Sequence, residues 1–389
     1  MASTLTNLPA AKTTQQEWRA TDVSVAEVLS RLSLLRAQAA HAEALDQDNP
    51  HPRNSVMDLV VVASDQAAAE KAAGTIASLA AHHPCRAIII LDEPGGESRI
   101  DATVTSYSHE LIESANCLYE QVFLRARGAA AEHLPSLIEA LLISDVTTYL
   151  WWTGSPPVKE PRFQTALTIA DVVIIDTSLL ERPYEGFLEL ADLGKRNPSL
   201  SIGDLHWARL RPWREILAQF FNPADRRGFL HGIGALGIDY VGHGRGNRSA
   251  AVLLAGWLAG ILGWRLKRAA GGAGGIVVAH LESPDSHVIE IAMRPLERDG
   301  FAAGEVTAVR LEAVSGGKTC SMTSLRDIDH PDQVITAGAV AGVELPARSL
   351  TIPSLDDASL INQLLISARG DQVFRRSLEA AAQLKAALR

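Results

Sequence analysis

Apolar and polar positions alternate in blocks through the first half of the chain. Four runs rich in Val and Ile each predict a buried strand, at residues 57–64, 86–92, 147–154 and 171–178. Four segments with apolar residues three and four apart predict helices between them, at residues 66–82, 132–143, 163–170 and 184–195. Continuous apolar strands that alternate with helices indicate a mostly parallel sheet covered on both faces.

Four further segments of this half have other patterns. Residues 100–108 and 118–127 alternate polar with apolar positions, which predicts an antiparallel pair inserted into the sheet. Residues 1–22 show no periodicity, and we expect them to be disordered. Ser24 precedes Glu27 by three positions, a capping-box spacing, and the apolar stripe behind it predicts a helix to about residue 45.

The second half follows a different pattern. Four alternating runs joined by short turns predict an antiparallel sheet, at residues 276–282, 288–294, 306–313 and 319–325. Three helices are expected beside it, at residues 249–264, 359–367 and 372–388. The first of these is apolar on all sides, which predicts a helix buried in the core.

Together these patterns predict a fold of the α/β plus α+β class. We expect an N-terminal Rossmann-like, mostly parallel sheet with an antiparallel insertion, followed by a C-terminal antiparallel sheet with helices. The turn-forming stretch 196–200 is the expected boundary. The predicted organisation is a tail and amphipathic helix in residues 1–50, an α/β domain in 51–200 and an α+β domain in 201–389.

One amphipathic stretch, residues 201–221, separates the two patterns. Asp204 is placed to cap a first short helix, because its carboxylate can accept hydrogen bonds from free backbone N–H groups. Pro212 has no N–H and therefore suits the first turn of a second helix. An apolar face follows at three- and four-residue spacing, formed by Trp213, Ile216, Leu217, Phe220 and Phe221.

The same stretch combines tryptophan with arginine. Trp207 and Trp213 alternate with Arg209, Arg211 and Arg214. Both residue types are favoured at the centres of protein interfaces, which makes the stretch a candidate for binding another protein. The ordinary alternative is that the indole rings belong to the core and the guanidinium groups are solvated.

Composition excludes some classes of function and leaves others open. The chain has 389 residues, 47% of them hydrophobic, and a formal net charge of −9. This balance argues against a nucleic-acid partner, which requires a basic surface. No secretory leader is evident and no segment suits a membrane span, so we expect neither membrane binding nor export. The expected location is the cytoplasm.

Cysteine and histidine spacing offers little chemistry. Cys85, Cys117 and Cys320 are far apart, which does not make a disulfide framework. Cys85 follows two histidines and precedes an arginine, so Cys85 and Cys117 are kept as candidates for a redox response. The histidines lack a ligand partner three or four residues away, and we expect no metal and no cofactor.

Motifs for catalysis are absent or incomplete. The chain has no G-x-S-x-G nucleophile motif and no complete glycine-rich phosphate loop. The loop Glu93–Gly96 follows a predicted parallel strand, where α/β folds often bind ligands. A sugar phosphate or nucleotide bound there, with sensing or catalysis, is the alternative to a role in protein binding.

Several stretches together resemble one family, the glucose-6-phosphate dehydrogenase assembly protein OpcA. The pair LWWTGSPP, from Leu150 to Pro157, and GDLHWARLRPWREILAQFF, from Gly203 to Phe221, forms a specific combination. Four further stretches match, namely His82–Ile90, Tyr119–Gly128, Asp171–Ser178 and Ala251–Trp264. The resemblance covers residues 50–265 most closely.

The resemblance implies a non-catalytic protein that binds glucose-6-phosphate dehydrogenase and promotes its active oligomer. This chain is similar to the family at Trp151, Trp152 and the 201–221 stretch. We expect these parts to meet at the domain junction and to form or brace the partner-binding face, with residues Trp151, Trp152, Asp204, Trp207, Arg209, Arg211, Pro212, Trp213 and Arg214. Cyanobacterial members of the family are linked to redox control through cysteines. Here no cysteine follows Cys320, so a C-terminal redox switch is not expected.

Overall fold

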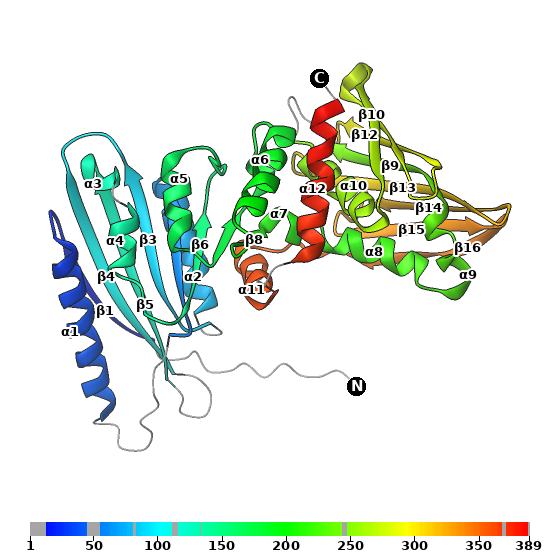
Figure 1. Cartoon of the computed structure of the whole chain (residues 1–389). Coiled ribbons are helices and arrows are strands. Elements are labelled where there is room, and N and C mark those ends of the chain that lie inside the picture. Colours follow the sequence, from blue (N-terminus) through cyan, green and yellow to red (C-terminus); the bar gives the residue numbers. More distant parts are fainter. Residues whose placement is uncertain are drawn as a thin grey trace, which may run out of the picture. The chain divides into compact units, whose positions relative to one another are not determined.

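The structure is a computed structural model in which two compact units can be described separately (Figure 1). It describes residues 13–44, 55–80, 83–110, 116–132, 134–242, 247–367 and 371–387. Unit 1 comprises residues 1–154 and 160–174, and unit 2 comprises residues 155–159 and 175–389. The second unit thus begins before the domain boundary expected at 196–200, which stays a prediction.

Unit 1 contains the predicted Rossmann-like sheet. The parallel strands are β2 (Met57–Ala63), β3 (Cys85–Glu93), β6 (Thr147–Trp152) and β7 (Val172–Ile175). The inserted antiparallel pair is β4 (Arg99–Glu110) and β5 (Asn116–Arg127), and β5 also runs parallel to β3. Within the unit the strand order is β1-β4-β5-β3-β2-β6-β7. β2 is buried along its whole length, as its uninterrupted apolar run predicts.

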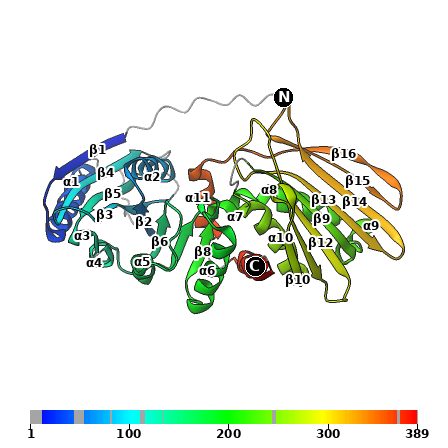
Figure 2. The same ribbon diagram turned by 90° about the horizontal axis from the view of Figure 1, so that it is seen from above.

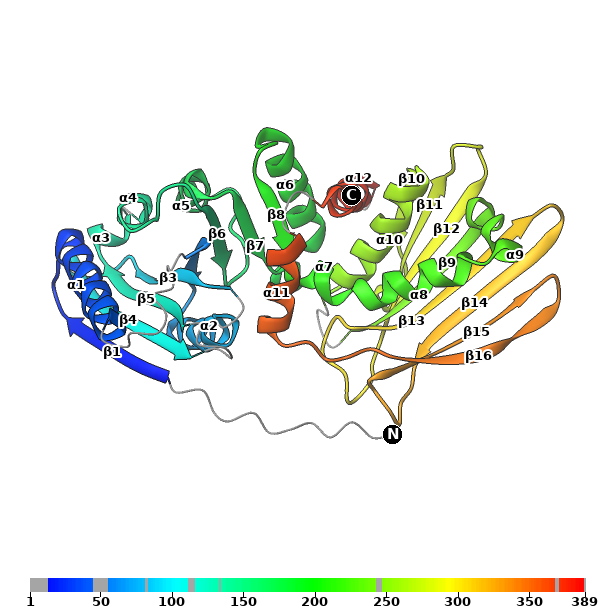
Figure 3. The same ribbon diagram turned by 90° about the horizontal axis from the view of Figure 1, so that it is seen from below.

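Helices cover both faces of this sheet. α2 (Gln66–Leu79) lies on one face, and α4 (Leu134–Glu139) and α5 (Pro161–Ala166) lie on the other (Figures 2 and 3). α3 (Ala129–Glu132) and α4 replace the single helix expected over 132–143. α1 (Val25–Ala44) begins where the capping pattern predicts, with the Glu27 amide donating to Ser24 Oγ at 3.3 Å.

The prediction of disorder for residues 1–22 is wrong for its described part. β1 (Thr13–Ala20) pairs antiparallel with β4 along eight residues, from Thr13 opposite His109 to Ala20 opposite Ala102. The segment is polar and has no apolar stripe, because β1 lies at the edge of the sheet. Backbone pairing with β4 organises it, and the side-chain pattern alone did not indicate this.

Unit 2 is built on a sheet of eight strands. Their order is β10-β11-β12-β9-β13-β14-β15-β16, and all described pairs are antiparallel except β12 with β9. The four predicted strands are β11 (Val277–Glu282), β12 (Val288–Leu296), β13 (Val306–Ser315) and β14 (Lys318–Arg326). Sequence reasoning missed the other four, β9 (Ile233–Val241), β10 (Arg265–Gly271), β15 (Gln333–Val340) and β16 (Val343–Thr351).

The helices of unit 2 lie against one face of this sheet. α8 (Arg211–Phe221) and α10 (Ser249–Leu262) lie across it (Figure 3). α12 (Gln372–Ala387) packs on α10, on α6 (Pro183–Arg196) and on β10. α10 is buried almost throughout, as its all-round apolar sequence predicts. α11 (Asp357–Ser367) packs against α7 (Leu205–Arg209).

Two glycines let α10 and α12 approach closely. A Cβ atom on Gly256 would lie 2.5 Å from the Ser377 carbonyl oxygen, and one on Gly260 would lie 2.7 Å from the Arg376 carbonyl oxygen. Any larger residue at these positions would therefore push the two backbones apart. No helix in the described ranges is long and apolar enough to cross a membrane.

Candidate partner-binding site

The 201–221 stretch folds as β8 (Ser201–Asp204), α7 and α8, all within unit 2. Asp204 is fully buried and caps α7, as predicted. Its Oδ1 accepts hydrogen bonds from the His206 amide at 3.1 Å and the Thr177 amide at 2.9 Å. Its Oδ2 accepts from Thr177 Oγ1 at 2.7 Å and the Trp207 amide at 3.3 Å. One carboxylate thus joins β8, the start of α7 and the turn after β7.

A second carboxylate, Asp176, lies beside the first. Its Oδ2 accepts a hydrogen bond from Arg209 Nη1 at 2.7 Å, and the Ser178 amide donates to its Oδ1 at 2.9 Å. Arg209 also faces Asp357 of α11 at 3.7 Å. Burial favours a higher pKa for Asp176, but Arg209, His206 and the Ser178 hydrogen bonds outweigh it and lower the pKa. Arg209 is therefore an internal ion-pair partner.

Burial shifts the pKa values of Asp204 and His206 in opposite directions. It raises the pKa of Asp204 to about 7, with the nearby Asp176 charge adding to the rise. It lowers the pKa of His206 to about 4, because a charged imidazolium has no solvent there. At neutral pH His206 is uncharged, and Asp204 is held by neutral donors without a direct cation.

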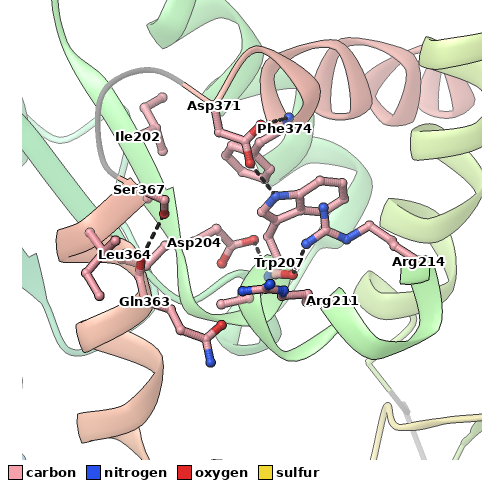
Figure 4. Close-up of a pocket in the computed structure, with 13 residues that line it drawn as sticks. Ile202, Asp204, Trp207, Arg211, Arg214, Gln363, Leu364, Ser367, Asp371 and Phe374 are labelled. Atoms are coloured by element: carbon pink, nitrogen blue, oxygen red, sulfur yellow. Dashed lines mark hydrogen bonds between the residues drawn. The ribbon is translucent and has the colours of Figure 1, made fainter. Parts of the chain in front are cut away.

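Trp207 is the centre of a separate arrangement, shown in Figure 4. Its Nε1 donates to Asp371 Oδ2 at 2.8 Å, and its ring lies 5.5 Å from that of Phe374. The Arg214 guanidinium carbon lies 3.5 Å from the centroid of the indole ring, and Nη2 donates to the Trp207 carbonyl at 3.2 Å. Such a stacked cation contributes about 1–2 kcal/mol when it is desolvated.

Asp371 connects this arrangement to the last helix. Its Oδ1 accepts from the Val373 and Phe374 amides at 2.9 Å each, which caps α12. Burial lowers the pKa of Arg214 to about 10, with the Asp371 charge acting in the opposite direction. Trp207, Arg214 and Asp371 therefore fix α7, α8 and α12 to one another.

α8 confirms the predicted amphipathic pattern. Pro212 stands in its first turn, and the predicted apolar face is buried, namely Trp213, Ile216, Leu217, Phe220 and Phe221. Trp213 and Trp207 are both inside the unit, so the structure places these rings in the core and not on an open surface. Of the three arginines in the stretch, Arg211 is the exposed one, with 60% of its side chain accessible and a 2.7 Å ion pair to Glu215.

A cavity of about 280 Å³ opens beside these residues. Its walls come from β8, α7, α8, α11 and the start of α12, and include Trp207, Arg211, Arg214, Gln363, Ile366 and Asp371 (Figure 4). Ile366 is an apolar residue with three quarters of its surface exposed. The rim thus combines one exposed cation with one exposed apolar side chain, while the stacked Trp207 and Arg214 form the wall.

The structure brings together Asp204, Trp207, Arg209, Pro212, Trp213 and Arg214, but Trp151 and Trp152 belong to unit 1. They end β6 and are buried, and Trp152 contacts Phe163 edge to face at 5.0 Å. Their expected meeting with the 201–221 stretch stays a prediction.

The remaining candidates of the sequence analysis are the cysteines Cys85 and Cys117 and the loop after β3. Cys85 is buried at the first position of β3, where a packed thiol was the ordinary alternative. The side chain of Cys117 lies outside the described residues. Glu93 forms ion pairs with Arg127 at 2.7 Å and Arg125 at 3.5 Å, so the loop after β3 begins with an engaged carboxylate. Among the described residues, no group of three His, Cys, Asp or Glu side chains could hold a metal ion.

Sequence reasoning missed four members of the site. Asp176, Thr177 and His206 belong to the Asp204 cluster, and Asp371 binds Trp207 from 164 positions away. Asp371 carried one local signal, since an aspartate just before a predicted helix suggests an N-cap. Nothing local identified its indole partner.

Two family models match most of the chain. The model described as glucose-6-phosphate dehydrogenase subunit N-terminal domain matches residues 76–192, and the model for the C-terminal domain matches residues 200–378. A relative from Synechocystis that bears the name OpcA is 29% identical over 253 residues, which is 64% of this chain and 52% of the relative. The OpcA protein from Nostoc punctiforme is 27% identical over 312 residues, 79% of this chain and 66% of the relative. The chain spans about half to two thirds of the length of these curated relatives.

Solved structures with a similar arrangement of the chain are oxidoreductases. An NAD binding oxidoreductase from Klebsiella pneumoniae aligns with a TM-score of 0.49 at 11% identity, over 86% of this chain and 97% of the other. The UDP-N-acetylglucosamine 3-dehydrogenase GnnA from Acidithiobacillus ferrooxidans aligns with a TM-score of 0.45 at 14% identity, over 85% and 97%. At these values neither alignment supports a conclusion about the fold or a reaction.

Proposed function

Because the chain belongs to the OpcA family of glucose-6-phosphate dehydrogenase assembly proteins, we propose that it binds glucose-6-phosphate dehydrogenase and promotes its active oligomer. The match of both domain models along the chain is the observation that carries this proposal. The chain then acts in the oxidative pentose phosphate pathway as a partner of the enzyme and catalyses no step itself. We place this action in the cytoplasm, where the buried thiols of Cys85 and Cys320 stay reduced.

Within the 201–221 stretch we propose one role for the residues that hold the surface in shape and another for the exposed residues. Its tryptophans and Asp204 are buried inside unit 2 and Arg209 is paired with Asp176, so we propose that these residues hold the shape of the surface. Arg211 and Ile366 are the exposed cation and the exposed apolar residue that line the cavity, beside the exposed polar residues Ser367 and Asp371. We propose that Arg211 and Ile366 contact the dehydrogenase.

Activation requires only a modest preference for one state of the enzyme. A partner that binds the active oligomer better than the inactive form shifts the equilibrium by that difference in binding free energy. A tenfold shift corresponds to about 1.4 kcal/mol, which one or two interface side chains can supply.

The test is an assay of the cognate dehydrogenase with and without this chain at micromolar concentration. We expect the rate to rise with wild-type protein and the two proteins to co-elute. The variant Arg211→Glu should weaken activation about tenfold, because it reverses an exposed charge at the proposed contact. Arg265→Glu, an exposed charge on β10, is the matched control and should activate normally.

Two outcomes would contradict the proposal at different levels. Unchanged kinetics and no co-elution would remove the role in dehydrogenase assembly. Normal activation by a folded Arg211→Glu variant would keep that role and move the contact elsewhere. Trp213→Ala is unsuited to this test, because truncating a buried tryptophan costs about 3–5 kcal/mol of stability by itself.

A further inference from the structure

The sheet of unit 2 has one face that no described helix of that unit covers. Side chains alternate along its strands, so that Leu236, Ile238 and Tyr240 of β9 point into the core while Ala235, Gly237 and Asp239 lie on the opposite face. Exposed apolar residues lie among the strand residues of this open face, with Val288 63% exposed, Val314 59% and Ile335 41%. These side chains leave apolar area on this face available for contact with another protein.

Strand pairing arranges the open face in three parallel rows. We name them the basic row, the middle row and the acidic row. The basic row contains Arg294, Asp239, Ala308, Leu325 and Ile335. The middle row contains Ala292, Gly237, Arg310, Thr323 and Ala337. The acidic row contains Glu290, Ala235, Glu312, Ser321 and Ala339. Neighbouring rows are two residues apart along each strand, which is about 6.6 Å.

Charge is distributed unequally between the outer rows. Asp239 accepts hydrogen bonds from Arg294 at 2.7 Å and from Arg310 at 2.6 Å, so two cations share one carboxylate and one positive charge remains. The acidic row carries Glu290 and Glu312. Glu290 faces His280 at 3.4 Å, and Glu312 is exposed with no ion pair among the described residues. The remaining positive charge therefore lies around Asp239, where Arg294 of the basic row and Arg310 of the middle row meet, and the negative charge lies along the acidic row.

Most residues of the middle row, which lies between the other two, have small side chains. Ala292, Gly237, Thr323 and Ala337 raise little above the backbone, and Arg310 turns its head toward Asp239. A two-fold axis that runs along this row, in the plane between two such faces, places the basic row of one copy over the acidic row of the other. Arg294 then meets the second Glu290, and Arg310 comes close to the second Glu312.

The available area suits a stable dimer. The open face extends over six neighbouring strands, β11, β12, β9, β13, β14 and β15. At about 4.8 Å spacing they span about 29 Å, and a strand length of about 25 Å gives roughly 700 Å² per copy. Standard interfaces bury about 800 Å² on each partner. Sheets that pack face to face lie about 10 Å apart, which small middle-row side chains permit.

From this charge pattern and area we propose that the open face of the unit 2 sheet is a self-association surface, and that its occupant is a second copy of this chain. The contact is isologous, since each copy supplies both the basic and the acidic row. The proposal does not depend on the role in dehydrogenase assembly, and the chain alone suffices to test it.

Sedimentation velocity of the full chain without dehydrogenase tests the proposal. We expect a dimer at micromolar concentration. Ala337→Arg places a large charged residue on the middle row, where it meets its own copy and, unlike Arg310, is not drawn aside by Asp239, so it should raise the dimer dissociation constant at least about tenfold. Ala218→Arg makes the same change at an exposed position of α8 and should leave the dimer intact.

A charge reversal tests the proposed dimer independently. Glu312→Arg opposes the arginines of the second copy without breaking an ion pair within its own chain, and we expect it to dissociate the dimer more strongly at low salt than at high salt. Glu139→Arg on α4 is the matched control.

Three results would overturn the proposal. These are a monomer at all concentrations, a dimer that neither Ala337→Arg nor Glu312→Arg weakens, and a monomer whose face variants lose binding to the dehydrogenase. The last result would assign the open face to the enzyme instead of a second copy.

Discussion

Two aspartates of unit 2, Asp204 and Asp239, solve the problem of a buried carboxylate in opposite ways. Both are almost inaccessible to solvent. Asp204 is held by three backbone amides and one hydroxyl, with no cation bonded to it. Asp239 is held by two arginines whose side chains are 38% and 40% exposed. The first arrangement fixes backbone segments, and the second organises a surface.

The difference determines what the hydrogen-bond donors lose when each carboxylate is removed. The amides around Asp204 are buried and lose their side-chain acceptor without it, while Thr177 Oγ1 also lies 3.4 Å from His206 Nδ1. The arginines around Asp239 can turn to water. Equal burial of the two carboxylates therefore does not imply equal importance for folding.

The largest expected effect is that of Asp204→Ala. It leaves the Thr177, His206 and Trp207 amides without their acceptor and removes the cap of α7, which should cost on the order of 4 kcal/mol. Urea unfolding monitored by tryptophan fluorescence measures this. A loss below about 1 kcal/mol would show that water replaces the carboxylate, contrary to the observed burial.

A pH titration separates Asp204 from its neighbour His206. The pKa of His206 is lowered in the folded chain, so stability is lost as pH falls from about 6.5 toward 4. The pKa of Asp204 is raised to about 7, so stability is gained as pH falls below 7 toward 4. The two contributions oppose each other between pH 7 and 5. His206→Gln removes one of them, and we expect that variant to gain up to about 2 kcal/mol relative to wild type over this range.

Urea unfolding of both proteins at pH 7 and pH 5 checks this expectation. Parallel pH dependence in wild type and His206→Gln would mean that His206 does not bind its proton more weakly in the folded state.

A smaller effect is expected at the second aspartate. Asp239→Asn weakens two ion pairs whose arginines are more than one third exposed, so solvent screening limits the cost to about 1 kcal/mol. The same unfolding measurement applies. A loss as large as that of Asp204→Ala would end the distinction between the two sites.

The smallest expected effect is the response to salt. Raising ionic strength from 0.1 M to 1 M shortens the Debye length from about 10 Å to about 3 Å. The stability difference between wild type and Asp239→Asn should shrink by a few tenths of a kcal/mol under this change, while that for Asp204→Ala stays constant. Equal salt sensitivity of both variants would contradict the comparison.

Local chemistry made half of the candidate site predictable. Asp204 as a cap and Pro212 in a first helical turn follow from the geometry of a few neighbouring residues. The partner of Trp207 does not, because Asp371 is distant in the chain and only tertiary packing joins them. Likewise, the buried state of Trp213 follows from its apolar stripe, whereas the exposure of Arg211 depends on the folding of α11 and α12.

The fold shows the same limit. β2 and β3 were predicted because buried parallel strands are continuous apolar runs. β9 was missed although it is central to its sheet, since Gly234 and Gly237 interrupt its pattern. β1, β15 and β16 lie at or near sheet edges and carry polar or exposed side chains. Backbone pairing defines them, and a one-dimensional pattern contains little of it.

The two close helix contacts at Gly256 and Gly260 bear on the order of folding during synthesis. Unit 1 is complete once residue 174 has emerged from the ribosome, whereas α10 keeps an uncovered apolar flank until α12 has emerged as well. We expect unit 1 to resist protease on stalled nascent chains that end before residue 372, and unit 2 to gain resistance only on longer chains from which α12 has emerged. The second half of the newborn polypeptide would then be the part that depends on chaperones.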